Sequence, residues 1–223
     1  MGKRLEKLSR GKFLLGFAII LLSVLGIILC GTYTCRSSQR PEKPTEYPEG
    51  KLPKQAKKVL RSALAGRWYP ADTEALRKQI TGLFQKANVR PINNVIALIL
   101  PHAGYQFSGP TAAKGLESIN RKYKRVVIIG PSHYVSMEEV LSVPKVIHYE
   151  TPLGQIPLDV EFIDRLLEYS MFQNVPHVHK YEHSVQIEVP LLQAALGEFK
   201  LVPIVVGDLD RETAAKMAAD IGR

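Results

Sequence analysis

Two short stretches, 95-VIALILPHAGY-105 and 126-VVIIGPSHY-134, decide the fold of this chain. Each opens with an unbroken apolar run of strand length, at residues 95–100 and 126–129, and a proline or glycine follows each run directly. Apolar runs bounded by turn residues are typical of strands buried on both faces, as in parallel sheets. We therefore predict two buried strands, each followed by a tight loop.

The pattern around these strands alternates between helix and strand. Amphipathic periodicity predicts helices at 72–87, 108–119, 159–169, 183–196 (kinked at Pro190) and 211–221. A third buried strand is predicted at 201–206, and a hairpin-like pair at 140–149 and 155–158 around Gly154. Together these elements predict an α/β fold, a layered domain with a largely parallel or mixed central sheet flanked by helices.

The N-terminal arm differs in composition from the rest of the chain. A basic flank at 1–12 precedes an apolar segment at 13–31, and a linker rich in proline and charge occupies 32–60. This order predicts an uncleaved transmembrane helix, hence a single-pass membrane protein with a cytoplasmic N-terminus and an extracytoplasmic globular domain at 61–223. A cleaved signal peptide and a buried core helix are the alternatives.

Charge and cysteine content exclude several classes of protein. The formal net charge of +9 lies entirely within residues 1–61, because residues 62–223 hold equal numbers of basic and acidic side chains. We therefore expect no nucleic-acid partner for the globular part. The only cysteines, Cys30 and Cys35, precede it, so it is neither a disulfide scaffold nor a cysteine-rich zinc module.

His102 and His133 are the strongest candidates for chemistry. Each follows the carboxyl end of a predicted strand, which is where ligands bind in open α/β sheets. If the strands are neighbours, the two imidazoles lie roughly 5 Å apart, the spacing between adjacent strands. Neutral imidazole binds iron, copper and zinc, so the pair predicts a metal site. The alternative is that each histidine is an ordinary polar loop residue.

A second cluster, Glu182-His183-Ser184, stands at the start of a predicted helix. Glu182 and His183 are candidate catalytic residues, because a carboxylate beside a histidine completes a metal shell or relays a proton. The alternative is a helix start in which Glu182 interacts with the positive end of the helix dipole. His177 and His179 could also bind a metal, but a solvated loop is the favoured interpretation.

Four motifs in this order resemble the Memo family, also called AmmeMemoRadiSam system protein B. They are 66-GRWYP-70, 101-PHAGY-105, 130-GPSH-133 and 182-EHS-184 followed by an apolar helix with Pro190. The resemblance implies a fold related to class III extradiol dioxygenases, whose centre holds non-haem iron. It carries the family's two site histidines over to His102 and His133.

The resemblance also implies that further site residues lie beyond the end of this chain, so we expect C-terminal truncation. The expected function is a membrane-anchored, Memo-like protein with a histidine-based metal site that supports dioxygenase-like redox chemistry. Iron is the expected cofactor, with copper or zinc as alternatives. The expected partners are the membrane and a small-molecule or peptide ligand in the cleft. A non-catalytic ligand- or peptide-binding module and a zinc hydrolase are the competing functions.

Overall fold

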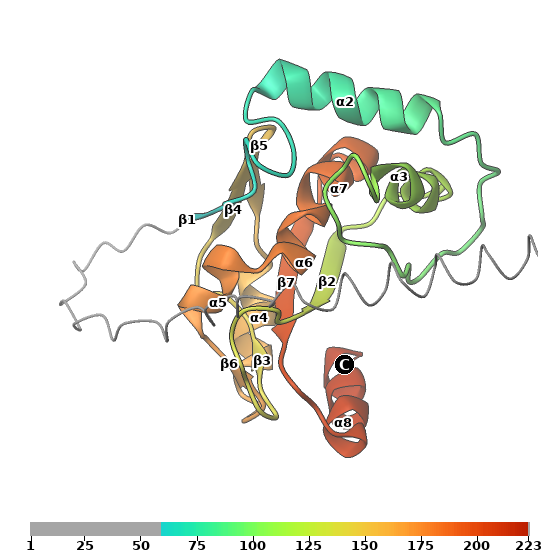
Figure 1. Ribbon diagram of the computed structural model, residues 1–223. Coiled ribbons are helices and arrows are strands. Elements are labelled where there is room, and N and C mark those ends of the chain that lie inside the picture. Colours follow the sequence, from blue (N-terminus) through green and yellow to red (C-terminus); the bar gives the residue numbers. More distant parts are fainter. Residues whose placement is uncertain (1–58, 223) are drawn as a thin grey trace, which may run out of the picture. The chain divides into compact units, whose positions relative to one another are not determined.

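In the computed structural model, residues 59–222 are described, and they form an α/β unit of two sheets with helices packed around them (Figure 1). Its elements are β1 (Val59–Arg61), α2 (Thr73–Gln85), α3 (Gly109–Glu117), β2 (Arg125–Pro131), β3 (Leu141–Ser142), β4 (His148–Thr151), β5 (Gly154–Pro157), α4 (Val160–Leu166), β6 (Phe172–Gln173), α5 (Pro176–Tyr181), α6 (His183–Gln186), α7 (Glu188–Leu196), β7 (Lys200–Val206) and α8 (Arg211–Ile221).

The larger sheet has four strands in the order β2-β7-β3-β6. β2 runs parallel to β7, with Val127 opposite Val202, whereas β3 runs antiparallel to β7 and parallel to β6. The sheet is therefore mixed. β7 is an inner strand, and residues 201–205 are all buried, which is why this stretch is apolar without alternation.

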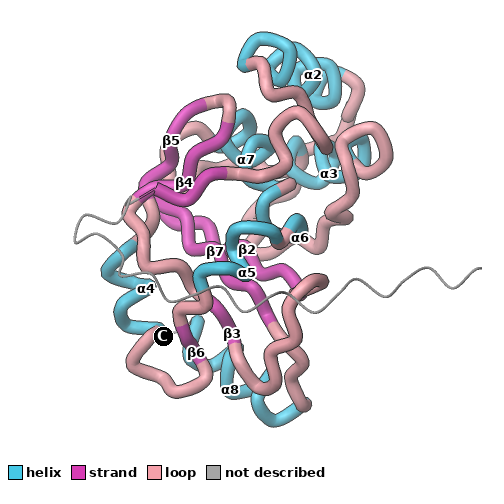
Figure 2. Tube along the Cα trace, turned by 60° about the vertical axis from the view of Figure 1, so that its left-hand side comes forward, coloured by secondary structure: helices cyan, strands magenta, loops and turns pink. Residues whose placement is uncertain are grey.

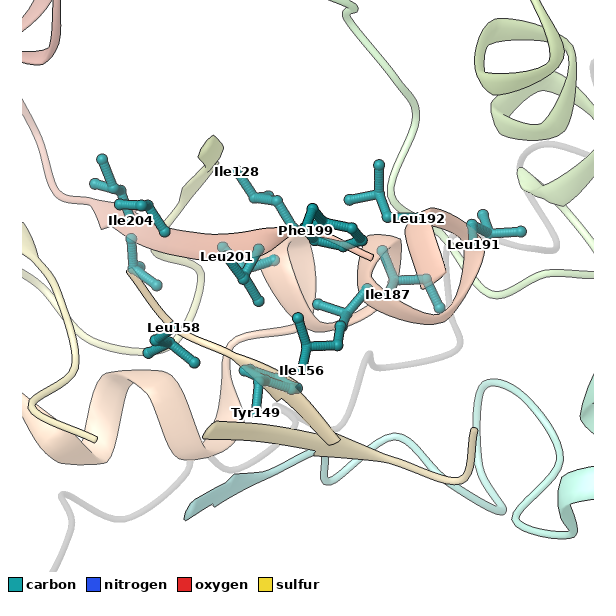
Figure 3. Packing of buried hydrophobic residues seen from close by; sticks show 14 of the residues in the cluster. Ile128, Tyr149, Ile156, Leu158, Ile187, Leu191, Leu192, Phe199, Leu201 and Ile204 are labelled. Atoms are coloured by element: carbon teal, nitrogen blue, oxygen red, sulfur yellow. The ribbon is translucent and has the colours of Figure 1, made fainter. Parts of the chain in front are cut away.

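The smaller sheet has the order β1-β4-β5, and β4 and β5 form a hairpin around Gly154, as predicted. The predicted first arm at 140–149 is too long, because only residues 148–149 belong to the hairpin, whereas Leu141–Ser142 form β3 of the larger sheet. Gly154 begins β5 with a φ of +117°, a backbone conformation that other residues rarely adopt. Tyr149 and Ile156, which pair across this hairpin, face the core beside β7 and α7 (Figure 3). The two sheets therefore share one hydrophobic core.

Three of the helices, α2, α4 and α8, begin at an aspartate cap. Asp72, Asp159 and Asp210 each accept a hydrogen bond from a backbone amide in the first turn of the helix that follows. α2 packs on α3 and α7, and the three helices lie together above the larger sheet in Figure 1. α6 instead contacts β2 and β7, so it lies against the sheet close to the loop that carries His133.

The predicted strand at 95–100 is wrong. This segment pairs with no described strand, and the whole connection between α2 and α3 is drawn as loop in Figure 2. Ile96 and Ile99 are 93% and 102% exposed, although Leu98 and Leu100 pack on the core. A cavity separates the segment from β2. Strand propensity alone does not create a pairing, because the neighbouring strand must also lie within reach.

The predicted helix at 183–196 is interrupted, but not at Pro190. α6 ends and α7 begins around Ile187, whose amide donates to the carbonyls of α6. Pro190 lies in the first turn of α7, where a backbone N–H has no partner within the helix, so a proline is tolerated there. The interruption frees α6 to set the position of His183 separately from α7.

The predicted single-pass membrane location must be corrected. Among residues 59–222, no helix combines the length and the apolar character needed to cross a bilayer. The basic flank at 1–12, the apolar segment at 13–31 and the linker up to residue 58 lie outside the described residues. The last two residues of the linker predicted at 32–60 belong to β1.

Candidate metal site

The structure brings His102 and His133 together. Their ring centroids are 5.3 Å apart, close to the predicted spacing. The route differs from the prediction, however, because only His133 follows a paired strand. The loop of His102 is held differently: the Tyr105 amide donates to the Trp68 carbonyl at 3.3 Å, and the buried Tyr105 hydroxyl donates to the Ile187 carbonyl at 2.9 Å. The tyrosine of the PHAGY stretch thus anchors the loop to two other segments.

His183 joins this pair from a third segment. Its ring centroid lies 4.3 Å from that of His133 and 5.6 Å from that of His102. One ligand nitrogen from each of the three histidines lies within 4.8 Å of the others. The sequence predicts His183 as a catalytic residue that either completes the metal shell or relays a proton; the geometry groups it with His102 and His133 in a three-histidine cluster. The roles of all three side chains stay predictions.

Glu182 lies behind the cluster and holds one of its members, His133, at two points. Its carboxylate accepts the His133 backbone N–H at Oε2 (2.6 Å) and lies 2.8 Å from His133 Nδ1 at Oε1. Oε1 also accepts the Ser184 amide at 3.0 Å, which makes Glu182 the N-cap of α6. The same carboxylate therefore caps α6, as the helix-start interpretation predicts, and also contacts His133 of the candidate site.

A close approach between β2 and α6 places His183. Ser184 Oγ donates to the Pro131 carbonyl at 2.9 Å, across the C-terminal end of β2. A Cβ atom at Gly130 would clash with Ser184 Oγ and lie 2.8 Å from Ser184 Cβ. Only glycine at position 130 lets α6 lie this close to β2. Gly130 of the GPSH stretch thus allows α6 to place His183 of the EHS stretch beside β2.

Burial favours the neutral form of two of the three histidines. The pKa of His102 is lowered by desolvation first and by His133 second, with Glu182 opposing. Desolvation also lowers the pKa of His183, reinforced by the two other histidines and again opposed by Glu182. For Glu182, burial alone would raise the pKa, but the hydrogen bonds from His133 and Ser184 outweigh it and hold the carboxyl below its usual value. The imidazoles of His102 and His183 are therefore neutral beside an ionised carboxylate.

This donor set fits a transition-metal ion. Neutral imidazole nitrogens are ligands for iron, copper and zinc, and nitrogen binds zinc at about 2.0–2.1 Å. Atoms already within 4.8 Å share one ion after small side-chain rotations. Nδ1 of His183 is buried and has no hydrogen-bond partner among the described residues, although Glu182 Oε1 is 3.3 Å away in unsuitable geometry. A buried nitrogen without a donor or acceptor is costly unless something binds it.

Two aromatic rings flank His183. The Trp68 ring lies 4.6 Å from that of His183, and the Tyr134 ring meets it edge-on at 5.7 Å. Neither was predicted as a site residue. Trp68 belongs to the GRWYP motif that carried the resemblance, whereas Tyr134 directly follows the GPSH motif. Membership in the motif was the available signal for Trp68.

His179 does not belong to the site, and the solvated-loop interpretation of 177–179 is wrong for it. His179 lies in α5, is only 3% exposed, and its Nε2 is 2.9 Å from Ser142 Oγ. His177, two residues earlier on the same helix, is exposed. A helix gives neighbouring residues opposite environments, which the sequence Pro-His-Val-His did not reveal.

Comparison with known proteins agrees with the four motifs. The family model described as Memo-like protein matches residues 61–223. A MEMO1 family protein of Methanococcoides burtonii is 35% identical over 161 residues, covering 72% of this chain and 59% of the relative. Another, from Aquifex aeolicus, is 36% identical over 170 residues, covering 74% and 60%. The chain thus spans about three fifths of the length of these relatives.

Proposed function

The chain belongs to the Memo family, and on that premise we propose that His102, His133 and His183 together bind one iron ion for redox chemistry on a small organic molecule. The observation that supports this is the convergence of three imidazoles from three separate segments, with ligand nitrogens within 4.8 Å. A bound iron would supply one-electron chemistry and open coordination positions, because three protein ligands leave room for a substrate.

Glu182 has the role of orienting His133. Because Oε1 accepts from the ring, the proton resides on Nδ1 and the lone pair of Nε2 faces away from the carboxylate. Hydrogen bonds of this kind from a ligand histidine to a carboxylate fix the tautomer and increase the basicity of the ring. The second contact, from the His133 amide to Oε2, holds the backbone of the same residue.

The rings of the histidine cluster differ in their exposure to solvent. The His133 side chain is 37% exposed and that of His183 only 13%, so the cluster is more open to solvent at His133 than at His183. Trp68 packs beside His183 on the shielded side. A small molecule is therefore the favoured ligand over a folded protein; an extended peptide stays the alternative that we expected from the family resemblance.

The test is metal content of the full chain in a Cys30→Ser, Cys35→Ser background, which removes the only thiols. We expect about one iron per chain after anaerobic loading, measured by mass spectrometry. Ala substitution of His102, His133 or His183 should each lower the affinity at least 100-fold, whereas His177→Ala, an exposed histidine outside the cluster, should not. Trp68, the sole tryptophan, reports binding by fluorescence quenching.

Two results would contradict the proposal. Equal metal content in the three cluster variants and in His177→Ala would show that the three histidines do not bind the metal. Tight binding of zinc with no retention of iron under anaerobic conditions would favour hydrolytic over redox chemistry, because zinc has no accessible redox states.

A further inference from the structure

A cavity of about 320 Å³ lies between segment 95–100 and β2. Its walls are largely aliphatic and include Leu98, Ile128 of β2 and Leu192 of α7, the last two labelled in Figure 3. Its lining also includes His102 and Ser184, so it adjoins the histidine cluster. Its volume falls at the lower end of the range for small-molecule pockets, roughly 300–1,000 Å³.

Glu188, at the start of α7, is the feature of this cavity that packing does not explain. It lines the cavity, is only 7% exposed, and its Oε2 is buried without a hydrogen-bond partner among residues 59–222. Burial raises the pKa of its carboxyl to about 7. The cation that lines the same cavity, Arg125, is bonded to Asp159 at 2.6 Å. The carboxyl therefore lacks a partner on the protein side.

An unpartnered buried carboxyl is costly, and the cost is relieved by a donor that enters with a ligand. Ammonium is the best such donor, because a hydrogen bond between two charged groups is stronger than one between neutral groups. The aliphatic walls beside it accommodate a hydrocarbon group. The site thus selects a molecule with a compact hydrocarbon body and one basic amine.

We propose that this cavity binds a small organic amine, whose ammonium group pairs with Glu188 and whose hydrocarbon part lies between β2 and segment 95–100. A molecule of this kind lies next to His102, so it is also the substrate class we assign to the metal centre. That last assignment rests on the proposed function; the binding itself does not.

The test is calorimetric titration of the metal-free full chain with benzylamine and, separately, with benzyl alcohol. We expect benzylamine to bind, and Glu188→Gln to weaken it at least 10-fold while changing benzyl alcohol less than about 2-fold. The matched control is Glu161→Gln, an exposed glutamate in α4, which should leave both unchanged. Leu192→Phe, which narrows the cavity, should weaken both ligands.

Absent benzylamine binding, or equal binding by the parent and Glu188→Gln, would overturn the proposal, provided that circular dichroism shows both chains folded. Equal affinity for benzyl alcohol and benzylamine would overturn the choice of an amine. Because the titration uses no metal, it separates the two proposals. Amine binding by a chain that holds no iron contradicts only the metal centre, and iron binding without amine binding contradicts only the cavity.

Discussion

Glu182 holds His133 at two points, accepting its backbone amide at 2.6 Å and facing its Nδ1 at 2.8 Å with the other carboxylate oxygen. Both oxygens thus face donors of the same residue, and Oε1 also accepts the Ser184 amide. A carboxylate can do this because it only accepts hydrogen bonds, whereas an amide cannot. The position of His133 in the cluster therefore depends on a charged side chain 49 residues away.

Glu182→Gln should weaken metal binding by about 10–100-fold, the usual effect of losing a carboxylate behind a ligand histidine. The glutamine NH2 must face either the His133 amide or the His133 ring, and in the second case it forces the ring into the wrong tautomer. Metal titration followed by Trp68 fluorescence measures the loss. The matched control is Glu168→Gln, which changes an exposed glutamate outside the cluster and should bind metal like the parent.

Gly130→Ala should disrupt the site through the backbone. The added Cβ would lie 2.8 Å from Ser184 Cβ, so α6 must move and carry His183 away from its partners. We expect a loss of about 1–3 kcal/mol in the free energy of unfolding, as for other overpacked positions, together with weakened metal binding.

Gly82→Ala is the control for that substitution. A Cβ at position 82 meets nothing within 4 Å inside α2, so this variant should gain about 0.5–1 kcal/mol from helix propensity. Urea unfolding of both variants decides the matter. A Gly130→Ala chain as stable and as metal-competent as the parent would show that the β2–α6 contact does not position His183.

His179 should make stability depend on pH. Desolvation lowers its pKa from 6.5 to about 4, partly opposed by the hydrogen bond with Ser142. The unfolded chain therefore takes up the proton first, so the contribution is fully present above pH 6.5 and is lost as the pH falls toward 4. The loss totals about 3 kcal/mol, at about 1.4 kcal/mol per unit of pKa. Replacing His179 with glutamine, whose amide can reach Ser142, should remove this slope in urea unfolding between pH 4 and 6.5.

Glu188 should make stability depend on pH in the direction opposite to that of His179. Burial raises its pKa from 4.5 to about 7, so the folded chain holds the proton longer than the unfolded chain. Its contribution is present below pH 4.5 and is lost as the pH rises to 7, by about 3 kcal/mol. Relative to the parent, Glu188→Gln should therefore gain stability across this range, as measured by urea unfolding at pH 4.5 and 7. An unchanged difference between the two pH values would show that the carboxyl is ionised throughout.

Local sequence determined the parts of this protein whose cause is local. The apolar run of β7, the hairpin at Gly154 and the aspartate caps of α2, α4 and α8 all follow from residues within a few positions of one another. The loops that carry His102 and His133 were recognisable for the same reason, since a proline or glycine ends the apolar run before each.

Tertiary structure decided which distant segments meet. Residues 95–100 have the composition of a strand, yet a cavity keeps them from β2, and periodicity contains no information about that separation. His183 lies in the cluster because the absence of a side chain at Gly130 lets Ser184 pack against β2. His179 is buried because α5 packs over Ser142. Secondary structure is set by short-range propensity, whereas contacts between segments are set by packing over the whole core. The sequence therefore named His183 as a candidate, but only the folded chain placed its ring beside those of His102 and His133.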